Sequence, residues 1–157
     1  MTTIRELRSE DQLEGLVELA RMHHEECAVE GMPFEREPVL LNGMRVILDT
    51  ERNFLNVWIA YKDDEPIGYC VGRCIPYFFN NEKHGWLDIW YVAPKHRKGW
   101  AAIKLIKSFE EWSRLNGVLQ IFAGVARSDK DEAKHIRKLF PKLSYEWCGS
   151  YYVKDTL

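Results

Sequence analysis

Cysteine is scarce in this sequence, and no two cysteines form a C-x-x-C pair. The four residues, Cys27, Cys70, Cys74 and Cys148, are expected to be reduced, mostly buried thiols rather than a disulfide framework. His23 and Cys27 lie four apart on a predicted helix, a spacing that zinc can use. Neither this pair nor the Cys70 and Cys74 pair has further ligands beside it, so we predict no metal.

Long apolar runs are also missing. No apolar stretch approaches the roughly 18 residues that a membrane-spanning helix needs, and the first residues lack the charged-then-apolar pattern of an export leader. We therefore expect a cytoplasmic protein with no membrane partner. The chain also lacks low-complexity tracts, internal repeats and long polar linkers, and 157 residues suit one domain. We predict a single domain over residues 1–157.

Neither sign of charge is in large excess, since the formal net charge is −2 at pH 7. The two halves of the chain nevertheless differ. Residues 1–66 carry 15 acidic and 7 basic side chains, whereas residues 67–157 carry 9 acidic and 15 basic ones. This division suits a protein that holds a polyanion with one half and a cation with the other. The alternative is that these charges only solvate the surface.

Hydrophobic periodicity predicts an α+β protein with the element order βααβββαβαβ, and one further strand can follow at the end of the chain. Strand patterns occupy residues 3–8, 56–62, 67–79, 84–93, 118–126 and 144–155. The turn residues 63–66 between the second and third of these predict a hairpin. Helical patterns occupy residues 9–31, 38–48, a segment ending at Asn116-Gly117, and 128–140. This order predicts a three-layer arrangement, with a mixed, mostly antiparallel sheet of about six to seven strands and helices on both faces.

The junction from Tyr91 to Ala102 combines several features of an anion site. The strand pattern ends at Pro94, and a helix follows whose first N–H groups lack internal partners and carry a partial positive charge. Gly99 allows a ligand to approach the backbone, and Arg97 and Lys98 add full charges. Such a site suits a phosphate. A basic loop that serves only solubility is the alternative.

The run Val92-Ala93-Pro94-Lys95-His96-Arg97 and the small-residue turn after it resemble the acetyl-CoA signature of the GNAT superfamily of N-acetyltransferases. The predicted element order is similar to that family's fold over nearly the whole chain. The match is closest with Arg97 as the first residue of the turn, because a one-residue shift would rotate the apolar stripe of the helix by about 100°. The turn then resembles an R-x-G-x-A-A variant of phage- or prophage-type members, with Trp100 where glycine is usual.

The resemblance implies that acetyl-CoA is the co-substrate. The residues that it assigns to the cofactor are Tyr91, Val92, Arg97, Lys98, Gly99, Trp100, Ala101, Ala102 and Ser128. In this assignment the backbone of Tyr91 and Val92 receives the thioester carbonyl, and the turn from Arg97 to Ala102 holds the diphosphate. Trp100 has to point away from the phosphates.

Amine acetylation requires a group that takes a proton, and the resemblance assigns this role to Asp88. Strand alternation places Asp88, Trp90 and Val92 on one face, opposite Leu87, Ile89 and Tyr91. An aspartate in so apolar a strand is costly unless it is paired or functional. A solvated aspartate on a half-exposed strand is the alternative.

The sequence offers several candidates for the general acid. The family's usual tyrosine position holds Phe140, which cannot donate a proton. Tyr145, Tyr152, Ser128 and water are the remaining candidates, and we assign Tyr145. If none of them acts, the chain binds CoA but catalyses poorly.

The resemblance places the acceptor against the first two helices, and we assign His23, Glu26 and Tyr77 to it. Acidic residues around Glu26 favour a cationic amine, such as a polyamine, an aminoglycoside or a protein lysine, unless they form only a solvated helix face.

The aromatic cluster of Tyr77, Phe78, Phe79, Trp86 and Trp90 is predicted to be core and sheet face. A stacking platform for single-stranded nucleic acid is the alternative, and nucleic acid is not among the expected partners. A homodimer stays open.

The sequence therefore predicts an acetyl-CoA-dependent N-acetyltransferase whose acceptor is a small-molecule or protein amine. The alternative is a GNAT-like module that binds a protein or nucleic-acid partner and catalyses weakly.

Overall fold

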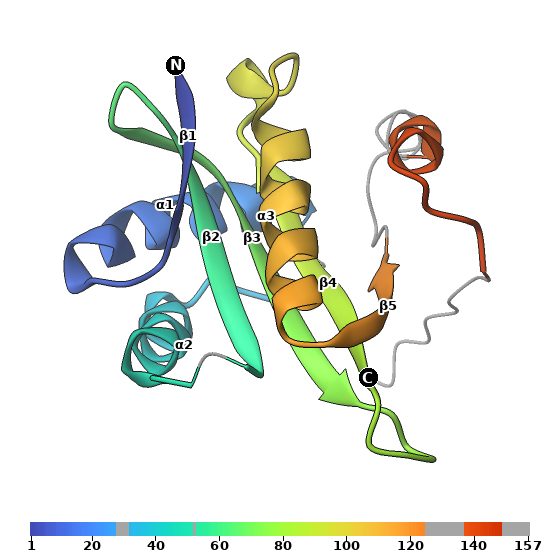
Figure 1. Ribbon diagram of the computed structural model, residues 1–157. Helices are drawn as coiled ribbons and strands as arrows, with labels where there is room; N and C mark the ends of the chain where they lie inside the picture. Colours follow the sequence, from blue (N-terminus) through green and yellow to red (C-terminus); the bar gives the residue numbers. More distant parts are fainter. Residues whose placement is uncertain (28–31, 52, 125–136, 149–157) are drawn as a thin grey trace. The chain divides into compact units, whose positions relative to one another are not determined.

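The computed structural model describes residues 1–27, 32–51, 53–124 and 137–148. They belong to two units, Met1–Gly124 and Val125–Leu157. The first unit holds the elements labelled in Figure 1, which are β1 (Thr2–Glu6), the 3-10 helix η1 (Glu10–Gln12), α1 (Leu13–Cys27), α2 (Arg36–Leu48), β2 (Leu55–Lys62), β3 (Glu65–Pro76), β4 (Lys83–Val92), the 3-10 helix η2 (Pro94–His96), α3 (Ala101–Leu115) and β5 (Val118–Ala123). In the second unit, residues 137–142 are helical.

The sheet of the first unit has five strands in the order β1-β2-β3-β4-β5. The pairs β1–β2, β2–β3 and β3–β4 are antiparallel, and β4 and β5 are parallel. Asp63 and Asp64 join β2 to β3 with φ angles of 51° and 62°, the positive values that a two-residue hairpin turn requires. The predicted hairpin and the mixed, mostly antiparallel sheet are confirmed.

Among the described residues the sheet has five strands, fewer than the six to seven predicted. A further strand was expected over residues 144–155, of which residues 145–148 have no regular secondary structure. Residues 149–157 lie outside the described residues, as do residues 125–136, which include most of the predicted helix at 128–140. The prediction of one domain over the whole chain stays a prediction.

Helices cover both faces of the sheet, as predicted (Figure 1). One core joins α1 and α2 to one face, through the buried side chains of Leu16, Leu19, Val46, Val57, Ile59, Tyr69 and Tyr91. Helix α3 covers the other face with the apolar stripe that the sequence predicts. Its residues Leu105, Ile106 and Phe109 are fully buried, and Trp112 nearly so. Because α3 crosses over the sheet, β5 can lie parallel to β4.

The alternation predicted along β4 is wrong at Asp88. Gly72 of β3 pairs with Leu87 and Val71 pairs with Ile89, so Asp88 is an extra residue in a β-bulge. A Cβ on Gly72 would meet the Phe109 ring of α3, whereas Val71 packs against the α1 and α2 core. The bulge therefore moves Asp88 away from the face of Trp90 and Val92.

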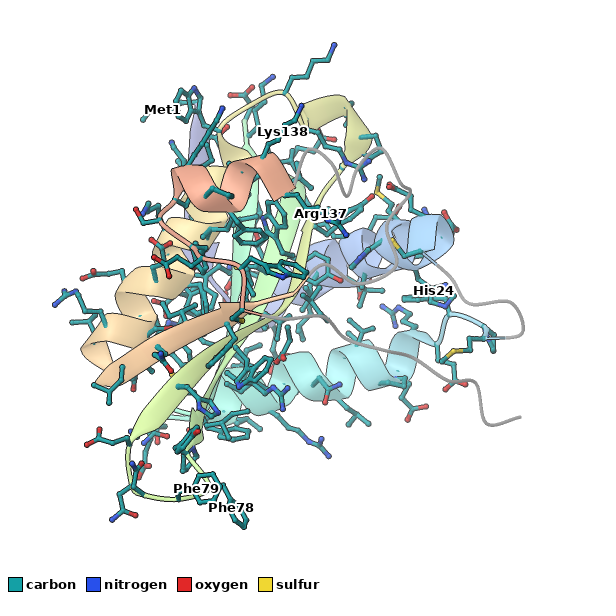
Figure 2. All side chains as sticks on the ribbon, turned by 90° about the vertical axis from the view of Figure 1, so that its right-hand side faces the viewer. Met1, His24, Phe78, Phe79, Arg137 and Lys138 are labelled. Atoms are coloured by element: carbon teal, nitrogen blue, oxygen red, sulfur yellow. The ribbon has the colours of Figure 1, made fainter. Side chains whose placement is uncertain are left out.

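The aromatic cluster is only partly buried. Trp86 stacks on Phe122 of β5 with ring centroids 4.9 Å apart, as expected for a sheet face. Phe78 and Phe79 instead lie at the outer end of the β3–β4 hairpin (Figure 2), with exposed fractions of 92% and 79%. For these two residues the core prediction is wrong, because the strand ends at Pro76 before they can join the packed face.

Candidate functional site

The edge of β4 toward β5 is open where the two strands part. Their pairing ends at Leu87 and Ala123, so among the described residues the rest of β4 has no β5 partner. Ala93 donates its N–H to Ile67 of β3 (2.9 Å), and the Val92 carbonyl accepts from Arg97 Nε (2.8 Å). Because successive backbone groups of a strand point to opposite sides, the Val92 N–H points toward the open edge and the Tyr91 N–H toward β3.

The turn after β4 presents the start of α3. The first backbone bond of this helix runs from Lys104 N–H to the Trp100 carbonyl (3.0 Å). Among the described residues, no acceptor takes the N–H groups of Ala101 and Ala102, as expected for a first helical turn. Gly99 already donates to the His96 carbonyl (3.1 Å), so its contribution is the space that its missing side chain leaves.

Trp100 does not fill this turn, because 70% of its surface is exposed. Lys98 is exposed beside it. A hollow of about 180 Å³ adjoins the turn, and its lining includes Lys62, Lys95 and Lys98. Lys95 donates to Glu65 (2.6 Å), which offsets part of the positive charge. The remaining lysines and the helix N-terminus keep the surroundings of the turn electropositive.

Arg97 is held from two sides. Besides its bond to the Val92 carbonyl, its Nη2 atom forms an ion pair with Glu26 of α1, and its guanidinium lies 5.6 Å from the centre of the Tyr91 ring. Its backbone N–H donates to the Pro94 carbonyl (3.3 Å). The residue that the sequence assigned to the diphosphate thus also fastens the turn to β4 and to α1.

A compact polar cluster lies where α1 crosses β3 and β4. Tyr91 donates its hydroxyl to Glu26 Oε1 (2.6 Å). The His23 ring stacks on Tyr91 with centroids 4.7 Å apart, and its Nδ1 lies 3.0 Å from the Tyr69 hydroxyl. The structure therefore brings His23 and Glu26 together and adds Tyr69, which the sequence did not single out. The assignment of His23 and Glu26 to the acceptor stays a prediction.

Burial sets the protonation of this cluster. It raises the pKa of Tyr69 and, together with the hydrogen bond to Glu26, the pKa of Tyr91, so both hydroxyls stay protonated. It lowers the pKa of His23, an effect that the nearby Glu26 carboxylate partly opposes. His23 is therefore neutral at neutral pH and has a ring nitrogen that can accept a hydrogen bond or a proton.

A hollow of about 450 Å³ opens beside this cluster. Its lining residues come from α1, from the link to α2, from α2 itself and from β3, and they are Ala20, His23, His24, Cys27, Met32, Pro33, Phe34, Glu35, Pro38, Val39 and Tyr69. His24, labelled in Figure 2, lies 5.8 Å from Phe34 between ring centres. The walls are mostly apolar, with imidazole, phenol and carboxylate groups among them, which is the usual make-up of a small-molecule site.

Asp88 lies on the same face of the sheet as this cluster because of the bulge. Both of its carboxylate oxygens are engaged by Arg73 of β3, through Nη2 to Oδ1 (2.7 Å) and through Nε to Oδ2. Each oxygen keeps a second lone pair, so Asp88 can still accept a hydrogen bond from a substrate while it is paired with Arg73. Arg73 is a second residue that the sequence did not single out, because only the register of β3 and β4 places it beside Asp88.

Of the remaining assigned residues, Tyr77 lies apart from the cluster, and the others belong to the second unit or lie outside the described residues. Tyr77 packs edge-on against His84 (5.4 Å), eight residues and so about 26 Å along the strand from Tyr69. Tyr145 lies in the second unit, where its ring contacts Phe140 (5.1 Å). Ser128 and Tyr152 lie outside the described residues. No group of His, Cys, Asp and Glu that could hold a metal occurs among the residues described, and within them no helix is long and apolar enough to cross a membrane.

Solved structures share this fold. The Brucella melitensis biovar Abortus 2308 ribosomal-protein-alanine N-acetyltransferase has a TM-score of 0.72 at 17% identity, with 99% of each chain covered. The aminoglycoside N-acetyltransferase AAC(6')-Iy in complex with CoA has a TM-score of 0.76 at 18% identity, with 99% of this chain and 95% of that one covered. Arabidopsis thaliana glucosamine-6-phosphate N-acetyltransferase has a TM-score of 0.76 at 12% identity, with 99% of each chain covered.

Sequence comparison gives the family directly. A comparison with curated protein sequences found no match. The profile of the Acetyltransferase (GNAT) family matches residues 16–139. This range runs from α1 to the helical segment of the second unit and includes β4, the turn after it and α3. The chain belongs to the GNAT acetyltransferase family.

Proposed function

We propose that this protein transfers an acetyl group from acetyl-CoA to a primary amine by direct attack in a ternary complex. The observation that carries the proposal is the geometry of the β4–α3 junction. There the Val92 N–H faces a strand edge that no described residue pairs with, and a helix begins with the N–H groups of Ala101 and Ala102, which have no acceptor among the same residues. Donors at both places suit a ligand that presents a carbonyl oxygen at one end and phosphates at the other.

The residues present fit acetyl-CoA. Small side chains at Gly99, Ala101 and Ala102 keep the turn open, Trp100 is directed to solvent, and Lys98 adds a cation beside the helix N-terminus. When bound, acetyl-CoA supplies the activated acetyl group and a thiolate leaving group. The Val92 N–H is the backbone donor available to the thioester carbonyl.

The acceptor amine is proposed to occupy the hollow beside His23 and Tyr69. The carboxylate of Glu35 lines the hollow, and that of Glu26 lies in the adjoining polar cluster, on the Tyr91 hydroxyl. Both favour a cationic amine, while the apolar walls favour a substrate with a hydrophobic body. Aminoglycoside and ribosomal-protein N-acetyltransferases occur among the structural neighbours, and both kinds of acceptor carry amines. The proton of the attacking amine passes either to Asp88 or to neutral His23, which lines the hollow.

Thermal melting with and without acetyl-CoA tests the proposal. A ligand at 100 times its dissociation constant adds about 2.7 kcal/mol of stability, and for this chain length each kcal/mol raises the melting temperature by roughly 2–4 °C. A Lys98→Glu variant that binds about tenfold more weakly would retain about half of that stabilisation at the same concentration. Lys107→Glu is the matched control, because Lys107 lies on α3 and pairs with Glu110 (2.6 Å).

If acetyl-CoA raised the melting temperature equally in the wild type and in Lys98→Glu, the ligand would bind away from the turn before α3. If it did not raise the melting temperature of the wild type, acetyl-CoA binding would be contradicted. The second outcome favours the alternative of a weakly catalytic binding module. Phe140 at the usual tyrosine position is the observation that supports this alternative. A cytoplasmic location, a phage-type origin of the turn and a homodimer stay predictions.

A further inference from the structure

Arg97 connects three parts of the candidate site. Its backbone belongs to the turn that precedes α3, its Nε donates to the Val92 carbonyl on the open edge of β4 (2.8 Å), and its Nη2 pairs with Glu26 of α1. A guanidinium offers its five N–H donors in a fixed fork. While Nε stays on Val92, the outer nitrogens can therefore exchange one anionic partner for another.

Glu26 is bound at both oxygens. Its Oε2 meets Arg97, and its Oε1 accepts from the Tyr91 hydroxyl (2.6 Å). Tyr91 is 5% exposed, so it is a fixed anchor for the carboxylate. The ion pair itself is more open, with exposed side-chain fractions of 34% for Arg97 and 30% for Glu26. A dissolved anion can therefore reach the guanidinium and compete with Glu26.

We propose that Glu26 is a positioning residue that couples the two substrates by competing with the diphosphate of acetyl-CoA for Arg97. This inference rests on the proposed function. A diphosphate at the turn draws the outer guanidinium nitrogens away from Glu26, because a phosphate accepts a guanidinium in the same forked geometry as a carboxylate and carries more charge. Glu26 keeps its bond to Tyr91 and presents Oε2 to the acceptor side, where a cationic amine can bind.

The coupling predicts an order of binding. Before acetyl-CoA arrives, Arg97 neutralises the carboxylate that an amine would use, so amine binding is weak. Afterwards the carboxylate is available, and the amine binds more tightly. Because linkage is reciprocal, any ligand that removes Glu26 from Arg97 also tightens the binding of acetyl-CoA. If Glu26 instead only holds Arg97 in the conformation that binds CoA, removing Glu26 from Arg97 should weaken the binding of acetyl-CoA.

Isothermal titration with CoA at low ionic strength distinguishes these two roles. Removing the competing carboxylate in Glu26→Gln should lower the dissociation constant of CoA by about two- to fivefold, the range expected for a partly exposed ion pair. Glu25→Gln is the matched control, since Glu25 is the neighbouring carboxylate of α1 and pairs with Arg21 instead. It removes the same charge without freeing Arg97, so any general electrostatic gain should appear in both variants.

A gain in Glu26→Gln that exceeds the gain in Glu25→Gln supports the coupling. It should also vanish in an Arg97→Gln background, where no guanidinium remains to compete for. An unchanged or weakened affinity in Glu26→Gln, or the same gain in the Arg97→Gln background, overturns the coupling while leaving the proposed function intact. Absence of CoA binding to the wild type overturns both.

A crystal structure of the CoA complex provides a second measurement that does not depend on any variant. The coupling requires an outer nitrogen of Arg97 on the diphosphate and a Glu26 that still accepts from Tyr91. An intact Arg97–Glu26 pair in a complex with bound diphosphate overturns it.

Discussion

Gly72→Ala should strongly destabilise the protein, because the backbone of β3 lies against the ring of Phe109. A Cβ at position 72 would lie 2.5 Å from Phe109 Cε2 and 3.3 Å from Trp58 Cζ3. Carbon atoms in a packed core are normally about 3.5–4.0 Å apart. The ring would have to move by about 1 Å. Phe109 is fully buried and packs against the rings of Trp58 and Trp112, at 6.1 and 6.3 Å between centroids, so it has little room to do so.

Overpacking a core by one methyl typically costs about 1–3 kcal/mol, and a clash with a fully buried ring should be at the upper end. We expect Gly72→Ala to lower the free energy of unfolding by about 2–3 kcal/mol, measured by urea denaturation followed by circular dichroism. Gly124→Ala is the matched control, because no described atom lies within 4 Å of the added methyl. It should change stability by less than about 0.5 kcal/mol, the usual range for surface substitutions.

Phe109→Leu makes room for the added methyl, so it identifies the cause. If the clash is with this ring, Gly72→Ala should cost at least about 1 kcal/mol less in the Phe109→Leu background, a coupling well above the usual additivity error. Two results would refute the packing of Phe109 against Gly72. One is that the effects of Gly72→Ala and Phe109→Leu on the free energy of unfolding simply add. The other is that Gly72→Ala alone changes this free energy by less than about 0.5 kcal/mol.

Three further outcomes are expected. Because burial lowers the pKa of His23, the folded state resists its protonation, and stability should fall as the pH drops below about 6.5, the ordinary histidine pKa. Between pH 7.5 and 5 the melting temperature should therefore fall less in His23→Gln than in the wild type, and an equal fall in both would contradict this. Asp88→Asn should lower kcat by about 10²–10⁴-fold if Asp88 is the base, with an unchanged dissociation constant for CoA; retained activity would direct attention to His23. Trp100→Ala should alter the unfolding free energy by less than about 0.5 kcal/mol, because the indole is 70% exposed, and a larger loss in a denaturation curve would show that the indole packs into the turn.

The sequence was sufficient for the features that depend on local order. Period-3.6 spacing predicted the buried stripe of α3, and the apolar and polar runs around Asp63 and Asp64 predicted the hairpin. The succession of Pro94, the basic residues and Ala101 predicted a helix start with donors for an anion. Each of these signals lies within about fifteen neighbouring residues, where chain geometry leaves few alternatives.

Only the tertiary structure decided how the site is assembled. The bulge at Asp88 arises where the register between β3 and β4 shifts by one residue. The alternation within β4 alone does not reveal how β3 pairs with it. The Glu26–Arg97 pair joins residues 71 positions apart, and Tyr69 and Arg73 reach the site only because β3 pairs with β4 and packs against α1. Sequence spacing fixes which residues share an element, whereas contacts between elements depend on packing, register and burial that emerge when the chain folds.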